Sequence, residues 1–161
     1  MAITRQHNKQ ILVMGVGNTL LQDDGVGVHV VNSIKEMSNP PDVNVLDGGT
    51  LGLSLLPEIE DAAGLIVVDA AQIDEAPGSI RVFRNVEMDR QLSGKKSTVH
   101  EVAVADLLAA AAMSGQLPAE RALVVIQPAS IEWGLKPTSP VRAAIPRARE
   151  KVAEIARGWS L

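Results

Sequence analysis

The sequence predicts an α/β fold: a mostly parallel, five-stranded twisted sheet with helices on both faces. Short apolar segments alternate along the chain with helical patterns, which is typical of strand–helix–strand units. Only 2% of the residues are aromatic whereas 46% are hydrophobic, so the core is built from aliphatic side chains, which pack well in parallel sheets. A chain of 161 residues can bury a core of its own, and we expect a single domain over residues 1–161.

Five apolar segments predict the strands of this sheet. The third segment, GLIVVD, is apolar at consecutive positions, which indicates a strand buried on both faces. Glycine and proline mark the turns: Gly48 follows the second segment, Pro77 precedes the fourth, and Pro128 follows the fifth. The predicted strands cover residues 10–16, 43–47, 64–69, 79–83 and 122–127.

Two helices are predicted between these strands. Apolar side chains recur at helical spacing over residues 24–37, and a proline pair ends that pattern. A second helix begins at a capping box in which Thr98 can accept from the backbone N–H of Glu101, whose side chain reaches back. This helix is expected to end near Ser114, before a glycine.

The remaining segments give weaker patterns. A last helix is expected within residues 140–158, where an apolar stripe repeats at intervals of three and four residues. Pro146 lies inside that stripe, so the helix is either kinked there or begins there. Residues 51–59 predict a helical turn, residues 85–97 are polar and irregular, and residues 1–9 are expected to be a loose tail.

Composition excludes several classes of function. The net charge of −4 gives no general attraction to nucleic acid or to an anionic membrane. The chain has no cysteine, which excludes disulfides, thiolate zinc sites and a cysteine nucleophile. The N-terminal residues lack the apolar core of a signal peptide, and no apolar run is long enough to span a bilayer. We therefore expect a cytoplasmic protein.

A glycine-rich turn at residues 15–28 (GVGNTLLQDDGVGV) connects the first strand to a helix, as a phosphate-binding loop would. The third position of the dinucleotide-binding fingerprint is Leu20 rather than glycine, and no Walker lysine follows. Asp23 and Asp24 also reverse the positive field that a phosphate needs, so the turn is better suited to a cation. Helix capping explains one of the two aspartates and leaves the other without a structural role; capping and metal binding both stay open.

Other candidate ligands lie at strand and helix ends. Asp69 and Asp47 each close a predicted strand, where an Asx-turn is the structural alternative. Of the three histidines, His7 falls in the tail, and His29 shares a helical face with polar residues that we expect to be solvated. His100 lies in the first turn of a capped helix, where the helix N-terminus is expected to lower its pKa and keep the ring neutral.

Asp24, Asp69 and His100 together offer two carboxylates and one imidazole. This donor set suits first-row ions such as Zn, Ni, Mn or Co, with water in the open positions. Both carboxylates lie at strand ends, where an α/β sheet forms its crevice, and the loop before His100 is long enough to bring it there. The sequence therefore predicts a metal-binding site formed by these three side chains.

The chain contains several motifs that resemble, in sequence and in order, those of the hydrogenase maturation proteases. These are the endopeptidases that process the large subunit of NiFe hydrogenases. The opening motif between Gly15 and Gly27 is specific, and the resemblance runs almost end to end. The similar segments are residues 11–31, 46–57, 65–70, 76–80, 99–111 and 124–135.

The resemblance implies a function and roles for individual residues. Asp24, Asp69 and His100 match the family's metal-binding positions, and Asp47 matches a further acidic position. The family often has glutamate where this chain has Asp24, and the shorter side chain moves the ligand atom by about one C–C bond, roughly 1.5 Å. The implied activity is removal of a C-terminal extension from the hydrogenase large-subunit precursor after nickel insertion. The nickel is then supplied by the substrate, and other divalent ions such as Zn or Cd can occupy the site. No nucleic acid or membrane partner is implied, and a monomer is the simplest expectation.

The mechanism we expect is metal-assisted peptide hydrolysis, in which a metal polarises the scissile carbonyl or activates a water. Asp24, Asp47, Asp69 and His100 are the candidate catalytic residues, and Asp47 is the candidate base that takes the proton of the water. A metal that only docks the substrate is an equal alternative. Ser54 is a rival nucleophile, but it lacks the second glycine of a nucleophile elbow. The non-enzymatic rival is a nickel-sensing or precursor-binding chaperone.

Overall fold

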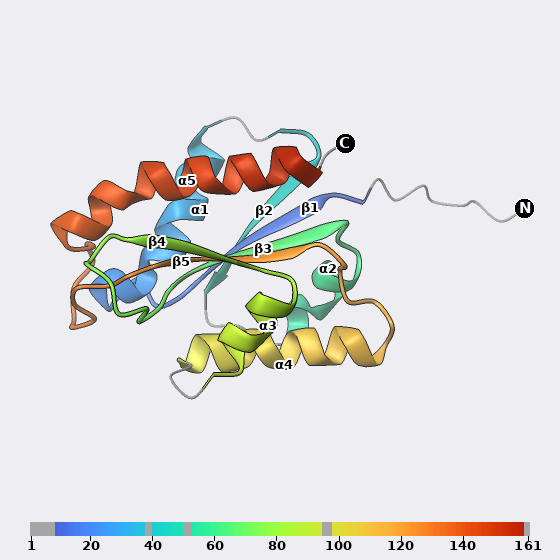
Figure 1. Ribbon diagram of the computed structural model, residues 1–161. Helices are drawn as coiled ribbons and strands as arrows, with labels where there is room; N and C mark the ends of the chain where they lie inside the picture. The colour runs from blue at the N-terminus through green and yellow to red at the C-terminus, as the bar shows by residue number, and fades with distance from the viewer. Residues whose placement is uncertain (1–8, 38–39, 50–52, 95–97, 160–161) are drawn as a thin grey trace, which may run out of the picture.

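The computed structural model describes residues 9–37, 40–49, 53–94 and 98–159, and its strands form one sheet in the order β2-β1-β3-β5-β4 (Figure 1). The first and last residues of each strand differ by at most two positions from those of a predicted segment. The strands are β1 (Ile11–Val16), β2 (Val43–Gly49), β3 (Gly64–Ala70), β4 (Ile80–Arg84) and β5 (Arg121–Ile126).

Four strands are parallel, and β4 runs antiparallel to β5 at one edge of the sheet. The connection from β3 to β4, residues 71–79, is too short for the crossover helix that a parallel strand would need. The chain therefore turns back at the end of the sheet where β3 finishes, through Gly78, whose φ of 87° favours glycine. The predicted mostly parallel, five-stranded sheet is confirmed.

Helices cover both faces of the sheet, as predicted (Figure 1). One layer consists of α1 (Val26–Glu36) and α5 (Ser139–Trp159); the other consists of α2 (Leu56–Glu60), α3 (Val86–Leu92) and α4 (Val99–Met113). Two short 3-10 helices, η1 (Gln22–Gly25) and η2 (Leu53–Leu55), precede α1 and α2. Among the residues that the structure describes, no helix has the length and apolar character needed to cross a membrane.

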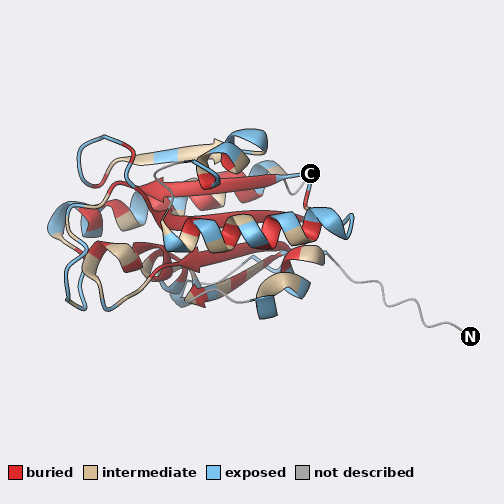
Figure 2. Ribbon diagram, turned by 90° about the horizontal axis from the view of Figure 1, so that it is seen from below, coloured by how far each residue is buried: buried red, intermediate tan, exposed pale blue. Residues whose placement is uncertain are grey.

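The central strands are buried (Figure 2). Their alternate side chains belong to the two halves of the core, one on each face of the sheet. In β3, Ile66 and Val68 pack in the cluster beneath α1 and α5. Leu65 and Val67 pack in the cluster beneath α2, α3 and α4. Asp69 continues this second series, so strand alternation directs its carboxylate to the side of the sheet that α4 covers.

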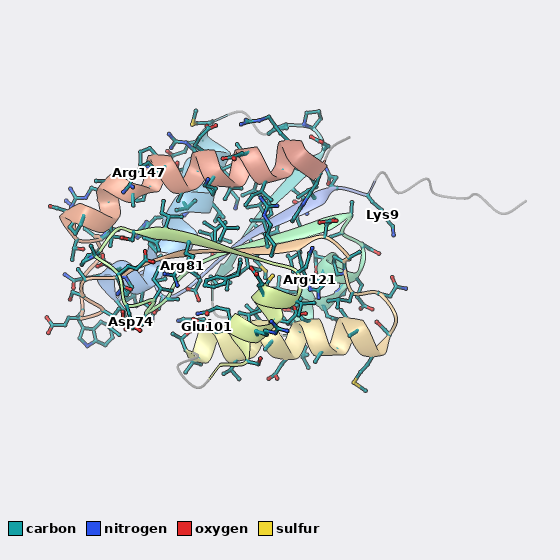
Figure 3. All side chains as sticks on the ribbon, viewed as in Figure 1. Lys9, Asp74, Arg81, Glu101, Arg121 and Arg147 are labelled. Carbon is teal, nitrogen blue, oxygen red and sulfur yellow. The ribbon has the colours of Figure 1, made fainter. Side chains whose placement is uncertain are left out.

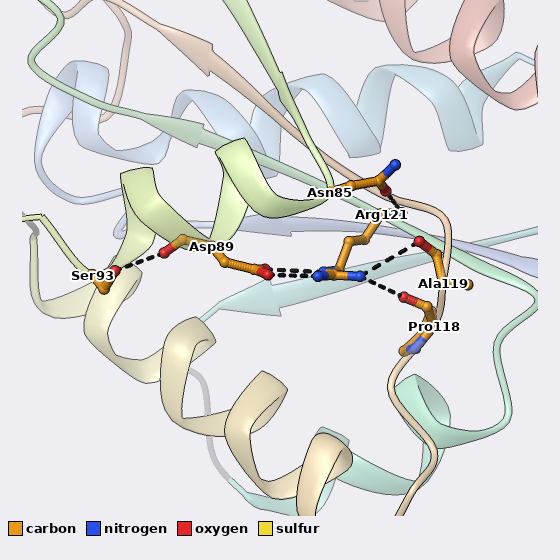
Figure 4. A network of polar contacts seen from close by, with 6 residues as sticks. All are labelled: Asn85, Asp89, Ser93, Pro118, Ala119 and Arg121. Atoms are coloured by element: carbon orange, nitrogen blue, oxygen red, sulfur yellow. Dashed lines mark hydrogen bonds and ion pairs between the residues drawn. The ribbon is translucent and has the colours of Figure 1, made fainter.

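The expectation that residues 85–97 are irregular is wrong for most of that stretch, because α3 occupies it. Met88 and Leu92 lie one helical turn apart and are both buried. The guanidinium of Arg121, at the start of β5, donates to both carboxylate oxygens of Asp89 in the middle of the helix (Figure 4). This support for α3 comes from a residue more than 30 positions away, so the local pattern could not indicate it. Residues 95–97 lie outside the described residues.

Helix boundaries differ from the expectations in ways that have local causes. The helix expected from residue 24 begins at Val26, because η1 takes up the preceding turn. The last helix begins at Ser139 and continues through Pro146, so it does not begin at the proline. The turn expected at residues 51–59 is confirmed by η2 and α2 from residue 53 onwards, and residues 50–52 lie outside the described residues. The expected tail, residues 1–9, also lies outside them except for Lys9.

The helical face that carries His29 is solvated only in part: Asn32 and Glu36 are exposed, whereas His29 and Ser33 are half-buried. The helix α5 packs beside α1 on this side of the sheet (Figure 1). The hydroxyl of Ser33, one turn after His29, accepts from the guanidinium of Arg149 in α5. The Nε2 atom of His29 is buried and has no hydrogen-bond partner among the described residues. Burial lowers the pKa of His29 below its usual 6.5.

Replacing His29 with glutamine is expected to reduce the loss of stability at acidic pH. Because the pKa of His29 is lower in the folded protein than in the unfolded chain, the unfolded chain binds the proton more readily. The free energy of unfolding of the wild type therefore falls as the pH drops below about 6.5, and the His29→Gln variant lacks this contribution. Denaturant titrations of both proteins from about pH 7.5 to about pH 5 measure the difference. An identical pH dependence of the two proteins would contradict this account of His29.

Candidate active site

The carboxyl ends of β1, β2, β3 and β5 meet at one end of the sheet, and the residues predicted for the site gather there (Figure 1). Asp24 lies in η1, which follows β1, and Asp69 is the second-last residue of β3. His100 lies in the first turn of α4, and Asp47 lies near the end of β2. The topology therefore brings together side chains that are up to 76 positions apart.

Asp24 and His100 are in direct contact, with 3.0 Å between Oδ2 of the aspartate and Nε2 of the histidine. The same carboxylate oxygen accepts from the backbone N–H of Asn18 at 3.0 Å. Burial raises the pKa of Asp24, but the hydrogen bonds to His100 and Asn18 favour the charged form more strongly, so the net pKa is lowered. Asp24 is thus a carboxylate whose charged form is favoured and which holds a half-buried imidazole.

The protonation expected for His100 is corrected by this contact. The helix N-terminus was expected to lower the pKa of the ring, whereas the hydrogen bond to Asp24 raises it above 6.5 against the opposing effect of burial. In this arrangement, without a metal, Nε2–H can donate to the carboxylate. A metal ion that takes Nε2 as a ligand would have to displace this proton.

Asp69 is almost fully buried, with 1% of its surface exposed. Its Oδ1 accepts from the backbone N–H of Ala70 at 2.8 Å, and its Oδ2 is buried without a hydrogen-bond partner among the described residues. Burial, together with the negative charges of Glu101 and Asp24, raises the pKa of Asp69 well above its usual value. A buried carboxylate oxygen without a partner is costly, and a cation would satisfy it.

Asp24, His100 and Asp69 do not form a complete metal site by themselves. Within residues 9–37, 40–49, 53–94 and 98–159, no three His, Cys, Asp or Glu side chains are grouped closely enough to hold an ion. The structure nevertheless brings His100 into contact with Asp24 and places Asp69 near enough for its pKa to respond to the charge of Asp24. The two carboxylates and the imidazole are donor types that nickel and zinc accept, so the chemistry of these side chains suits a divalent ion although their present arrangement does not enclose one.

Asp47 is exposed, and its Oδ1 accepts from the backbone N–H of Gly49 at 2.8 Å. This is the Asx-turn that was the structural alternative for this residue. Among the described residues, its side chain has no hydrogen bond to Asp24, Asp69 or His100. The part of Asp47 in catalysis therefore stays a prediction.

The two neighbouring aspartates of the glycine-rich turn have separate roles. Asp24 faces His100, whereas Asp23 is fully buried and accepts four hydrogen bonds. Its donors are the backbone N–H groups of Ala129, Ser130 and Thr138 and the Thr138 hydroxyl, at 2.7–3.0 Å. Asp23 thus fastens the connection between β5 and α5 to η1. Within the described part of the chain, neither η1 nor α1 has a side-chain hydrogen bond at its N-cap, so the capping interpretation is wrong for both aspartates, and metal binding by Asp24 stays a prediction.

The glycines of this turn allow close packing. A side chain on Gly17, whose φ is 126°, would place its Cβ 2.0 Å from the carbonyl oxygen of Asp24. A side chain on Gly27 would place its Cβ 2.1 Å from the carbonyl oxygen of Val68, one residue before Asp69. Glycine at these two positions lets η1 and α1 approach β1 and β3, which positions Asp24 near Asp69.

Glu101 is a residue of the site that the sequence interpretation missed. Its backbone N–H donates to Thr98 Oγ1 at 3.2 Å, which confirms the Thr98 half of the predicted capping box. Its side chain is buried between α4 and the sheet, and burial raises its pKa to about 7 although the charge of His100 opposes the shift (Figure 3). Its negative charge in turn raises the pKa of Asp69. A glutamate three residues after a threonine has an ordinary explanation in helix capping, so the sequence held no separate signal for this role.

The chain is similar in sequence to proteins of hydrogenase maturation. Residues 28–155 match the family model described as hydrogenase maturation protease. The hydrogenase 2 maturation protease of Escherichia coli K12 is 37% identical over 145 residues, which are 89% of this chain and 88% of that protein. The hydrogenase expression/formation protein HupM of Azotobacter chroococcum is 40% identical over 137 residues, or 84% of this chain. The match covers 66% of HupM, so the chain spans about two thirds of the length of that relative.

Solved structures of similar proteins have the same fold. The hydrogenase maturating endopeptidase HybD from E. coli superimposes with a TM-score of 0.88 at 35% identity, with 94% of each chain covered. The NiFe hydrogenase maturation protease HybD from Thermococcus kodakarensis superimposes with a TM-score of 0.79 at 25% identity, with 91% of this chain and 99% of that chain covered.

Proposed function

We propose that this chain, which belongs to the hydrogenase maturation protease family, removes the C-terminal extension of a NiFe hydrogenase large-subunit precursor after nickel insertion. Membership of the family makes it a hydrolase of hydrogenase maturation. The observation that carries the proposal is the contact of Asp24 with His100 at the carboxyl end of the sheet, together with the buried Oδ2 of Asp69, which has no hydrogen-bond partner among the described residues.

In this proposal nickel reaches the site as part of the substrate. Asp24 and His100 would give up their mutual hydrogen bond and would hold the nickel of the precursor together with Asp69, the proton of His100 Nε2 and any proton on Asp69 leaving to water. These contacts orient the precursor so that its scissile peptide bond lies beside Asp24 and His100. The nickel either polarises the scissile carbonyl or only docks the substrate, and in both versions Asp47 is the proposed base for the attacking water.

Processing is expected to depend on nickel in the substrate. The wild-type protein is incubated with nickel-loaded and with nickel-free precursor, and the mass of the large subunit is measured before and after. The loaded precursor should lose a C-terminal peptide and the nickel-free precursor should not, because only the former offers an ion to Asp24, Asp69 and His100. Cleavage of both forms at equal rates would contradict the role of nickel.

The same experiment separates the rival functions. A nickel-sensing or precursor-binding chaperone would bind the loaded precursor and leave its mass unchanged. A serine hydrolase is less compatible with the site, since Ser54 is exposed in η2 and His100 contacts Asp24 instead. Loss of activity in a Ser54→Ala variant would restore that mechanism.

The proposal extends to partner and compartment. The partner is the large-subunit precursor, which we take to be bound by a monomer of this chain in the cytoplasm. A concentration-independent sedimentation coefficient of the free protein would support the monomer.

A further inference from the structure

Large apolar side chains are exposed on two adjoining segments next to the candidate site. Leu20, which precedes η1, is 47% exposed, and in the β5–α5 connection Ile131, Trp133 and Leu135 are 57%, 80% and 71% exposed. We call these four side chains the apolar rim. Exposed apolar groups that gather beside a site, rather than singly, mark a surface for an interaction partner.

The two segments of the apolar rim are held together by backbone hydrogen bonds. Gly134 donates to the carbonyl oxygen of Leu20 and accepts from the N–H of Gln22, both at 2.9 Å, and Leu21 forms a parallel bridge with Gly134. The buried Asp23 carboxylate fastens the same connection at both of its ends, as described above. The rim is therefore a fixed part of the fold, and its apolar side chains are exposed in a defined arrangement.

A pocket of about 230 Å³ joins the apolar rim to the side of Asp24, the residue that contacts His100. Ile131 of the rim and Asp24 both line it, and Thr98, two residues before His100, lines it as well. Much of the remaining wall is formed by small apolar side chains, including Ala71 and Ala129. A polypeptide that presents a bond to Asp24 can thus place an apolar side chain in this pocket and continue over the rim.

We propose that the apolar rim and this pocket bind apolar side chains of the C-terminal extension that is removed from the precursor. This inference rests on the proposed function and names the part of the substrate that the surface receives. Continuity of the pocket with Asp24 favours the extension over the folded body of the large subunit, because the segment in the pocket must lie next to the scissile bond. Trp133 is the expected anchor, since an aromatic side chain buries the most apolar surface on binding.

Trp133→Ala is the variant that tests the proposal, and Met113→Ala is its matched control. Met113 is 90% exposed at the end of α4, which is the end of the helix away from His100. With nickel-loaded precursor, Trp133→Ala is expected to raise KM roughly 10- to 30-fold with kcat little changed, and Met113→Ala to change neither. In the inactive His100→Ala background, adding Trp133→Ala should raise the Kd for the precursor by the same factor. It should leave the Kd for mature large subunit, which lacks the extension, unchanged.

Three results would overturn the proposal. Trp133→Ala could behave like Met113→Ala, or it could weaken the precursor and the mature subunit equally, in which case the rim contacts the body of the subunit. The wild type could also form a dimer that Trp133→Ala abolishes, in which case the rim binds a second copy of the chain. If the wild type leaves loaded precursor uncut, the proposed function fails, and the two Kd comparisons still decide what the rim binds.

Discussion

Alanine at position 24, 69 or 100 is expected to abolish processing of nickel-loaded precursor while the protein stays folded. Each replacement removes one of the three donors that we propose to meet the nickel of the substrate, and His100→Ala also removes one of the two hydrogen bonds to the Asp24 carboxylate among the described residues. Loss of a contact worth several kcal/mol in the transition state lowers kcat/KM by about 10³-fold or more. Mass spectrometry of the large subunit over a time course measures the residual rate.

Asp106→Ala provides the control for this series, because Asp106 is exposed on α4, the helix that carries His100. It should process precursor at the wild-type rate. Full cleavage by all three alanine variants would refute the site, and a wild-type rate for Asp69→Ala alone would restrict it to Asp24 and His100. Asp47→Asn separates the base from the ligands: it should slow the cleavage step without weakening the binding of loaded precursor, if Asp47 takes the proton of the water.

Asp69 gives this prediction a second readout that a purely structural residue would not produce. Its Oδ2 is buried without a partner among the described residues, and its pKa is raised, so the folded protein disfavours the charged form. Asp69→Asn removes that charge at nearly the same volume and should keep or raise Tm while processing is lost. A variant with lower Tm and full activity would show that the carboxylate serves the fold rather than the substrate.

The strands and the end of the sheet that carries the site could be predicted because both depend on local sequence. Consecutive apolar residues identify strands such as β3, and an aspartate that follows them lies at the carboxyl edge of a parallel sheet. The position of His100 in the first turn of α4 could be predicted from the helix cap at Thr98. These signals lie within a few residues of the features that they predict.

The features that the sequence did not indicate depend on contacts between distant residues. The pKa of His100 is governed by Asp24, 76 positions earlier, rather than by its own helix N-terminus. On the face that carries His29, Ser33 bonds to Arg149 of α5, and the support of α3 comes from Arg121. In each case a partner from another element decides the outcome.

Asp23→Ala is expected to be the most destabilising single change among the acidic residues of the site region. The four hydrogen bonds to its buried carboxylate come from residues 106 to 115 positions further along the chain, and alanine would leave these part-buried donors without the carboxylate. Removing one partner from a buried charged network costs about 3–5 kcal/mol. For a chain of this size, that corresponds to a fall in Tm of roughly 10 °C, which differential scanning calorimetry measures.

Asp23→Asn and Asp61→Ala make this expectation specific. Asparagine keeps the shape but turns an acceptor oxygen into an N–H donor that faces other donors, so Asp23→Asn should recover little of the lost stability. Asp61 is exposed at the end of α2, and Asp61→Ala should leave Tm within about 2 °C of the wild type. Because Asp23 fastens the β5–α5 connection to η1, its loss should also weaken precursor binding at temperatures where the protein is still folded. A Tm for Asp23→Ala equal to that of Asp61→Ala would show that the β5–α5 connection is held without the carboxylate.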